Sequence, residues 1–285
     1  MTPKTILLAT DLSPRCDRAL DRATSLAAVW GARLIVLHVL QNPPPVTDVS
    51  SWRRPPDPRQ AAWQRVRRDL RDPEGIEIDV VVERGDPASL IPQLADSLGC
   101  GLVVTGMARD ETLGRVLLGT TVEALARRTE VPVLVVKSRP HGPYRKAVVA
   151  TDFSEGSRCA LLTALALLPQ AQLSLFHAYD VGFEGIAGDR MAARESAGRE
   201  ARAAGEAFLA ATPAAATAQH PVKLFCEYGD VGGLLENLVQ EHGMDLAIVG
   251  TAGRGALAGM LLGSVAQRLL ADLSVDVLAV RRRRN

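Results

Sequence analysis

The sequence is poor in cysteine. Four cysteines occur in 285 residues, none of them in a CxxC pair, and no group of histidines accompanies them. This arrangement argues against a zinc site and against a disulfide framework. We therefore expect four free thiols, as in a reducing cytosol: Cys16, Cys100, Cys159 and Cys226.

Lysine is equally scarce, and charge of either sign is not in excess. Only four of the 33 basic residues are lysines, and 32 acidic residues reduce the formal net charge to +1. This balance argues against a nucleic-acid partner. No lysine follows a glycine-rich stretch in the P-loop pattern, and the G-x-S-x-G nucleophile motif is missing. The sequence therefore lacks the marks of a P-loop hydrolase or an esterase.

Long apolar runs are also missing. No uninterrupted run reaches membrane-spanning length, and the start, "MTPKTILLATDLSP", is too short and polar for a signal peptide. We expect a cytoplasmic protein with no membrane partner.

The chain instead contains one pattern twice. "KTILLATDLSPRCDRAL" at residues 4–20 is similar to "KAVVATDFSEGSRCALL" at 146–162, and further similar segments follow in the same order in both halves. Asp11 and Asp152 stand 141 positions apart in these copies. We expect two domains, residues 1–139 and 144–285, joined by a proline-containing linker.

Short apolar runs alternate with helical patterns in each half. Such runs are typical of strands that are buried on both faces of a parallel sheet. The expected strands are Ile6–Ala9, Leu34–Val39, Ile78–Val82, Leu102–Thr105 and Val133–Val136, then Ala147–Ala150, Leu173–Ala178, Lys223–Glu227, Leu246–Val249 and Val275–Val280. The fold class is therefore α/β, with two doubly wound, Rossmann-like units.

Two segments fit this alternation less well. Residues 41–58 are rich in proline and are expected to form a surface loop, followed by an arginine-rich helix over 63–72. We interpret that helix and the arginines at 281–284 as solvated.

Glycines gather after the strand that ends at Val249. Gly250 and Gly253 allow the chain to turn sharply and to approach a ligand closely, and Gly263-Ser264 opens the next helical pattern. The free N–H groups at a helix start favour an anion, and Ser264 can cap the helix or donate to a phosphate. Thr151 and Asp152 follow the first strand of this half and reach the same sheet edge. Alternatively, Asp152 only caps a helix and the glycines only form turns.

The spacing G-x2-G-x9-G-[ST] after a strand resembles the nucleotide-binding signature of the universal stress protein family. The "ATD" after the first strand and the histidine near the end of the second, His38 and His177, resemble that family too. The resemblance covers both halves. It implies a five-stranded parallel sheet in each unit and ATP or AMP in the crevice, with adenine near Asp152 and Ala178; a role for Mg²⁺ stays open. His177 itself we interpret as a packing residue at a strand end.

The resemblance also implies the contact residues of the C-terminal half. They are Ala150, Thr151, Asp152, Ala178, Val249, Gly250, Gly253, Arg254, Gly263, Ser264 and Val265. A weaker site in the N-terminal half would use Thr10, Asp11, Val39, Gly106, Gly119 and Thr120.

The N-terminal half departs from the motif. Arg109 replaces the second glycine, and Asp110 and Glu111 follow it. A long side chain and two acidic neighbours predict a weak or empty site, although the guanidinium could instead hold a phosphate.

The sequence favours a stress-response regulatory protein that binds adenine nucleotide mainly in its C-terminal half. The alternatives are a slow ATPase or phosphotransfer enzyme of the same fold, and a ligand-free scaffold. The apolar last strands of the two halves predict an intramolecular pseudo-dimer, with a homodimer also open. No catalytic residue and no metal ligand are expected, and the partner protein is unknown.

Overall fold

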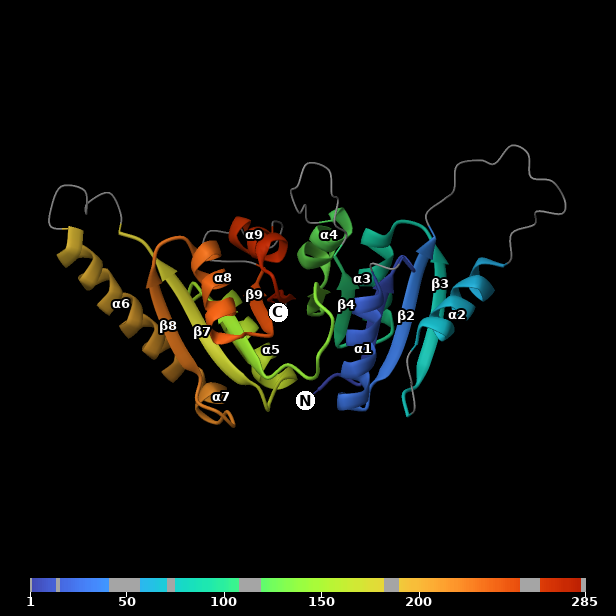
Figure 1. The fold of residues 1–285 in the computed structure, drawn as a ribbon, viewed down its shortest axis with the longest axis horizontal. Helices are drawn as coiled ribbons and strands as arrows, with labels where there is room; N and C mark the ends of the chain where they lie inside the picture. Colours follow the sequence, from blue (N-terminus) through green and yellow to red (C-terminus); the bar gives the residue numbers. More distant parts are fainter. Residues whose placement is uncertain are drawn as a thin grey trace. The chain divides into compact units, whose positions relative to one another are not determined.

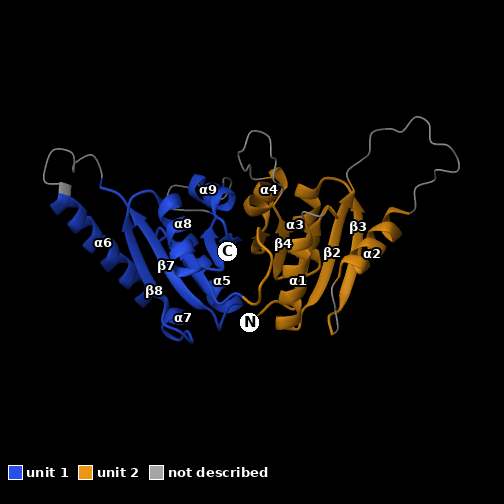
Figure 2. Ribbon diagram, viewed as in Figure 1, with its two compact units in different colours: residues 1, 144–285 blue, residues 2–143 orange. Residues whose placement is uncertain are grey.

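This computed structural model describes residues 2–13, 16–40, 57–70, 75–107, 119–181, 190–251 and 262–282. They form two compact units, Thr2–Pro143 (the N-terminal unit) and Tyr144–Asn285 (the C-terminal unit), which are coloured separately in Figure 2. The predicted pairing of the last strand of one unit with the last strand of the other stays a prediction.

Strands and helices alternate in the N-terminal unit (Figure 1). Its elements are β1 (Thr5–Thr10), α1 (Asp17–Trp30), β2 (Arg33–Leu40), α2 (Pro58–Asp69), β3 (Ile78–Arg84), α3 (Pro87–Ser97), β4 (Leu102–Gly106), α4 (Thr120–Arg128) and β5 (Val133–Val136). The strand order is β3-β2-β1-β4-β5, with parallel pairs throughout this unit.

The C-terminal unit repeats this order. Its elements are β6 (Lys146–Ala150), α5 (Glu155–Leu167), β7 (Gln172–Tyr179), α6 (Arg190–Ala210), α7 (Pro213–Ala216), β8 (Lys223–Tyr228), α8 (Val231–His242), β9 (Leu246–Gly250), α9 (Ser264–Asp272) and β10 (Asp276–Val280). Its strands pair in parallel in the order β8-β7-β6-β9-β10. The expected α/β class, with a five-stranded parallel sheet in each unit, is confirmed.

The strands form because their side chains are apolar on both faces. Ile6, Leu7 and Leu8 of β1 are 0% exposed, as are Ala147, Val148 and Val149 of β6. Helices must therefore cover both faces of each sheet. With right-handed crossovers, the reversal of strand order places α5 and α6 on one face and α8 and α9 on the other. Contacts of α8 with α9, and of α6 with β7 and β8, agree with this arrangement.

Most strands extend one or two residues beyond their predicted ranges, and two elements differ in another way. The helix expected over 63–72 begins earlier, at Pro58, because the Asp57 carboxylate accepts the Arg59 N–H at 3.0 Å and caps it, and it ends at Asp69. The last strand begins at Asp276 rather than Val275. The part of the predicted loop over residues 41–56 lies outside the described residues.

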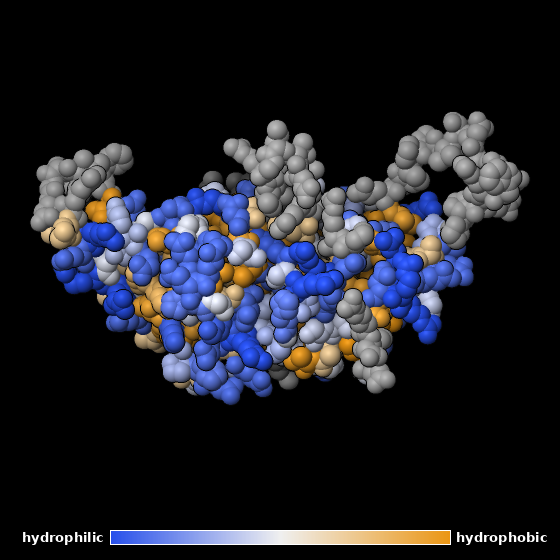
Figure 3. Space-filling view, viewed as in Figure 1, coloured by the Kyte–Doolittle hydropathy of each residue, from blue (hydrophilic) through white to orange (hydrophobic). Residues whose placement is uncertain are grey.

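The structure also bears on the predictions about cysteines and membrane-spanning segments. All four cysteines are free, as predicted. Within the described ranges, no helix is both long and apolar enough to cross a membrane. On the face seen in Figure 3, hydrophilic residues cover most of the described surface, and apolar residues form separate patches between them.

Candidate functional site

The strand order of the C-terminal unit creates a crevice position. β6 lies between β7 and β9, with Ala150 in register with Phe176 on one side and Val249 on the other. After β6 the chain continues to β7 on one side of β6, and after β8 it crosses to β9 on the other side. The connections that follow β6 and β8 therefore run in opposite directions, and the strand order reverses between β6 and β9. Ligands in open α/β sheets bind beyond the carboxyl ends of strands at such a switch point.

The described residues predicted to contact nucleotide gather around this edge. Ala150 is the last residue of β6, and Thr151 and Asp152 follow it. Ala178 is the second-last residue of β7. Val249 and Gly250 end β9, Gly263 precedes α9, and Ser264 and Val265 begin that helix. Gly253 and Arg254 lie outside the described residues.

The start of α9 offers backbone donors. Gly263 is the residue before the helix, and no side chain caps the first turn. Its own N–H donates to the Thr251 carbonyl at 3.0 Å. The N–H groups of the next three residues, 264–266, have no acceptor within the helix because the helical ladder begins after them. They form a positive end at which an anion is stabilised.

Ser264 does not cap α9. It is the first residue of the helix, whereas Gly263 holds the capping position with φ −59° and ψ 139°. Of the two roles predicted for Ser264, only donation of its exposed hydroxyl to a ligand is compatible with this position.

The physical reason for a glycine differs between the two described glycines of the motif, Gly250 and Gly263. A Cβ on Gly250 would lie 3.0 Å from the carbonyl carbon and oxygen of Gly156 and 3.3 Å from the Ser157 nitrogen. Gly250 is therefore needed for the close packing of β9 on the first turn of α5, a reason that the sequence did not indicate. A Cβ on Gly263 would meet only the Thr251 oxygen, at 3.7 Å, among the described residues. Within the part of the chain that the structure describes, neither packing nor the backbone angle explains that glycine.

Asp152 is anchored by the start of α5. Its Oδ1 accepts the Ser157 hydroxyl at 2.6 Å and the Ser154 N–H at 3.1 Å. The N-cap of α5 is Ser154, whose hydroxyl accepts the Ser157 N–H at 3.3 Å. The alternative interpretation, that Asp152 caps the helix, is wrong because Ser154 is the capping residue; Asp152 instead orders the turn that leads into α5.

A strained residue follows Asp152 and was not predicted. Phe153 has a φ of +61°, in the left-handed region that residues other than glycine rarely adopt. Its ring lies 4.3 Å from the His177 ring, and His177 Nδ1 lies 2.8 Å from the Thr151 carbonyl oxygen. His177 therefore fixes the loop after β6, which confirms its interpretation as a packing residue. Strain of this kind persists where the surrounding structure holds it and is often found at functional sites.

The N-terminal unit builds the same loop. Leu12 has φ +58°, and His38 Nδ1 lies 2.9 Å from the Thr10 carbonyl oxygen. The signal in the sequence was the histidine that recurs near the end of the second strand of each half. The remaining weaker candidates occupy matching places: Thr10 ends β1 and Asp11 follows it, Val39 lies in β2, Gly106 ends β4, and Gly119 and Thr120 stand at the start of α4.

Asp11 carries its charge readily. Burial raises the pKa of this carboxyl, but hydrogen bonds from the Ser13 N–H at 2.8 Å and from the Cys16 thiol at 3.1 Å outweigh burial. The pKa of Asp11 therefore lies below its usual value, and its carboxylate is ionised at neutral pH. Burial raises the pKa of the Cys16 thiol in turn, so this thiol stays protonated and keeps donating.

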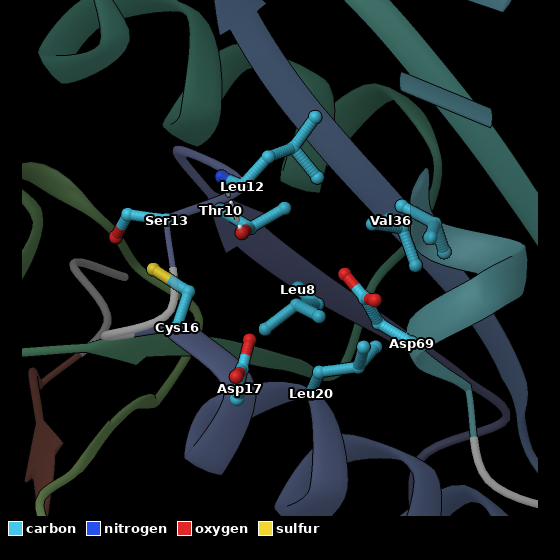
Figure 4. Close-up of a pocket in the computed structure, with 10 residues that line it drawn as sticks. Leu8, Thr10, Leu12, Ser13, Cys16, Asp17, Leu20, Val36 and Asp69 are labelled. Carbon is cyan, nitrogen blue, oxygen red and sulfur yellow. Dashed lines mark hydrogen bonds between the residues drawn. The ribbon is translucent and has the colours of Figure 1, made fainter. Parts of the chain in front are cut away.

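A small cavity lies beneath this loop (Figure 4). Thr10, Leu12 and Cys16 line it from the loop, and the carboxyl groups of Asp17 and Asp69 point toward it from α1 and α2. Its volume is about 10 Å³, room for roughly one water molecule. It cannot accept a nucleotide. Arg109, Asp110 and Glu111, on which the prediction of a weak N-terminal site depends, lie outside the described residues.

The layer beneath the corresponding C-terminal loop is filled differently. The Phe153 ring lies 5.7 Å from the Phe208 ring, and the Arg158 guanidinium stacks on Phe208 at 4.5 Å. Arg158 also donates to the Thr212 hydroxyl at 2.5 Å. Apolar rings and an arginine thus stand where the N-terminal unit has small apolar groups and carboxylates.

Comparison with known proteins agrees with these two repeats. The model of the universal stress protein family matches residues 2–137 and again residues 143–281. The chain belongs to the universal stress protein family.

Relatives of two lengths match this chain. A universal stress protein from Mycolicibacterium smegmatis is 28% identical over 98% of this chain and 97% of its own length. One from Thermus aquaticus is 30% identical over 47% of this chain and 98% of its own length. Among solved structures, a universal stress protein from Archaeoglobus fulgidus matches 98% of this chain and 99% of its own, with 20% identity and a TM-score of 0.65. The tandem arrangement is therefore shared with other proteins of the family.

Proposed function

We propose that the C-terminal unit binds an adenine nucleotide, ATP or AMP, at the carboxyl edge of its sheet. The observation that carries this proposal is the start of α9, where three backbone N–H groups lack an acceptor in the helix and Gly263 is bare without a packing reason. A phosphate chain is the anion that such a helix start holds best.

The other end of the nucleotide would lie against the β6 loop. Asp152 is held in place by Ser154 and Ser157, so its carboxylate can accept from an adenine amino group or a ribose hydroxyl without a loss of side-chain entropy on binding. Ala178 would contribute backbone groups from β7. The spacing from Gly250 to Ser264, typical of the family's nucleotide motif, supports this orientation.

The proposed role is regulatory. A ligand that bridges the loop after β6 and the start of α9 stabilises one arrangement of these segments by mass action. The level of adenine nucleotide would then set the population of that arrangement, and through it the binding of a partner protein. Differences in the N-terminal unit around Asp17 and Asp69 support one nucleotide per chain, held by the C-terminal unit.

Calorimetric titration of nucleotide-free protein with ATP tests this proposal. We expect one site per chain, and we expect Gly263→Val to weaken ATP binding at least about 100-fold because its branched side chain obstructs two or more charge-assisted hydrogen bonds. The matched control is Gly119→Val, which makes the same change at φ −59° and ψ 140° in the N-terminal unit. That variant should bind ATP as the unaltered protein does.

Two results would contradict the proposal. Two equivalent sites per chain would show that both units bind. Loss of binding in Gly119→Val with retention in Gly263→Val would place the nucleotide in the N-terminal unit.

A further inference from the structure

A second cavity lies at the opposite edge of the C-terminal sheet. It has a volume of about 240 Å³ and is lined by the first residues of β6, β7 and β8, by the segment before β8 and by the end of α8. These elements lie together in the C-terminal unit, with α8 packed on β7 (Figure 1). The nucleotide crevice is at the carboxyl ends of the strands, so this cavity is separate from it.

Lysine and histidine, which are both rare in this chain, are frequent in the lining of the cavity. Lys146 and Lys223 line it, as do His220 and His242. These are two of the four lysines and two of the five histidines in the whole sequence. No aspartate or glutamate is among the lining residues. The carboxylate of Asp245, which follows the lining residue Met244, accepts the backbone N–H groups of residues 145 and 146 at 2.8 and 2.9 Å.

Two polar side chains of the lining have no protein partner among the described residues. Ser174 is 4% exposed, and its hydroxyl has no hydrogen-bond partner among the described residues. Lys223 stands in register with Ser174 on the neighbouring strand, and its ammonium group has no hydrogen bond or ion pair within the described ranges. The Ser174 hydroxyl is not among the buried atoms that lack a partner, and Lys223 is exposed, so both donors are accessible from the cavity and an anion can accept a hydrogen bond from each.

The N-terminal unit carries different side chains at the same two positions. In register, Ile35 stands where Ser174 does, and Asp79 stands where Lys223 does. Ile35 is 2% exposed, and Asp79 accepts the Arg33 Nε–H at 2.6 Å. An apolar side chain and an internal ion pair thus replace the hydroxyl and the unpaired ammonium.

The remaining wall is apolar. The Phe225 ring packs against the His242 ring at 5.2 Å, and Met244 is 7% exposed. Lys146 Nζ donates to the His242 carbonyl at 3.0 Å, which holds one positive charge at the rim. The volume is below the range of about 300–1,000 Å³ that is usual for drug-sized ligands, so the occupant is small.

We propose that this cavity binds a small organic anion whose carboxylate or phosphate group contacts Ser174 and Lys223 and whose apolar body packs on Phe225 and Met244. The anion is recognised by the donors and the body by the apolar wall. Such a site would give the protein a second small-molecule input, at the end of the sheet away from the nucleotide.

Benzoate and phenyl phosphate are suitable probes, and benzyl alcohol is their neutral counterpart. Each is titrated into the full chain, saturated with ATP, and binding is followed by ligand-observed NMR and by calorimetry. We expect one or both anions to bind, with benzyl alcohol weaker by about tenfold or more because it lacks the charge-assisted contact. The better of the two anions identifies the head group.

Variants locate the site. Lys223→Gln should weaken the preferred anion by about tenfold, and Ser174→Ile, which copies the N-terminal unit, should abolish its binding. If Ser174→Ile does not fold, Lys223→Gln still decides, because its side chain is on the surface. The matched control is Lys4→Gln, an exposed lysine of the other unit, which should leave binding unchanged.

Several outcomes would overturn the proposal. These are no binding of either anion at about 10 mM, equal binding of benzyl alcohol, or equal effects of Lys223→Gln and Lys4→Gln. Stronger probe binding when ATP is left out, or loss of probe binding in Gly263→Val, would place the probe in the nucleotide crevice instead. Failure of the nucleotide proposal alone would leave these results unchanged.

Discussion

Alanine at Gly250 and alanine at Gly263 should have opposite consequences for stability. Both glycines belong to one sequence motif, but a Cβ at Gly250 would approach backbone atoms of Gly156 to 3.0 Å. Backbone cannot rotate away as a side chain end can, so β9 and α5 must separate by a few tenths of an ångström. A Cβ at Gly263 lies at an ordinary contact distance of 3.7 Å from the Thr251 oxygen.

The expected magnitudes follow from these distances. Overpacking of this kind costs about 1–3 kcal/mol. A change of that size lowers the melting temperature by roughly 3–9 °C in a unit of this length. Gly263→Ala should instead be neutral or stabilising by up to about 1 kcal/mol, because φ −59° suits alanine and the unfolded chain loses freedom.

Thermal unfolding followed by circular dichroism, without nucleotide, measures both variants against the unaltered protein. The reasoning is refuted if Gly250→Ala is as stable as the unaltered chain. It is also refuted if Gly263→Ala is the more destabilised of the two, because that result would assign the packing role to the wrong glycine.

Three further changes test other contacts. Tyr144→Phe removes the hydroxyl that donates to the buried Asp276 Oδ2 at 2.6 Å, and urea unfolding should show a loss of about 1–3 kcal/mol. Burial raises the pKa of the Cys100 thiol to about 11, so iodoacetamide at pH 8 should label it far more slowly in the folded than in the urea-unfolded protein; equal rates would contradict its burial. The folded pKa of Asp11 is depressed, so its contribution to stability is present above the unfolded pKa of about 3.9 and is lost as the pH falls further. Cys16→Ala removes one donor, and NMR titration should show the pKa of Asp11 moving up toward the ordinary value; an unchanged pKa would exclude the thiol as its partner.

The elements of the fold could be predicted because they depend on local pattern. Apolar runs such as Ile6–Ala9 and Leu246–Val249 became buried strands, and their duplication indicated two units. The early start of α2 was missed because the proline at its first position and the cap at Asp57 were assigned to the loop. Pattern therefore identified each element more reliably than its boundary.

The structural role of each site residue could not be predicted from the spacing of the motif in the sequence. Gly250 and Gly263 look alike in the motif, and only the approach of Gly156 from another element separates them. The positive φ of Phe153 depends on a histidine 24 positions later in the chain, and the cavity around Ser174 depends on strand register. Each of these is a tertiary relation, to which local sequence gives no direct signal.

The two units together separate what the fold requires from what a ligand requires. The left-handed residue after the aspartate, the histidine bond to the loop carbonyl and the bare glycine before the last helix occur in both units. Shared geometry of this kind cannot decide which unit binds nucleotide. Charge in this loop does not decide either, because Arg158 stands where the N-terminal unit has Asp17 but is paired with Glu155 at 3.1 Å. The assignment of the nucleotide to the C-terminal unit therefore stays a proposal that rests on the motif, and the titrations of Gly263→Val and Gly119→Val are what decide it.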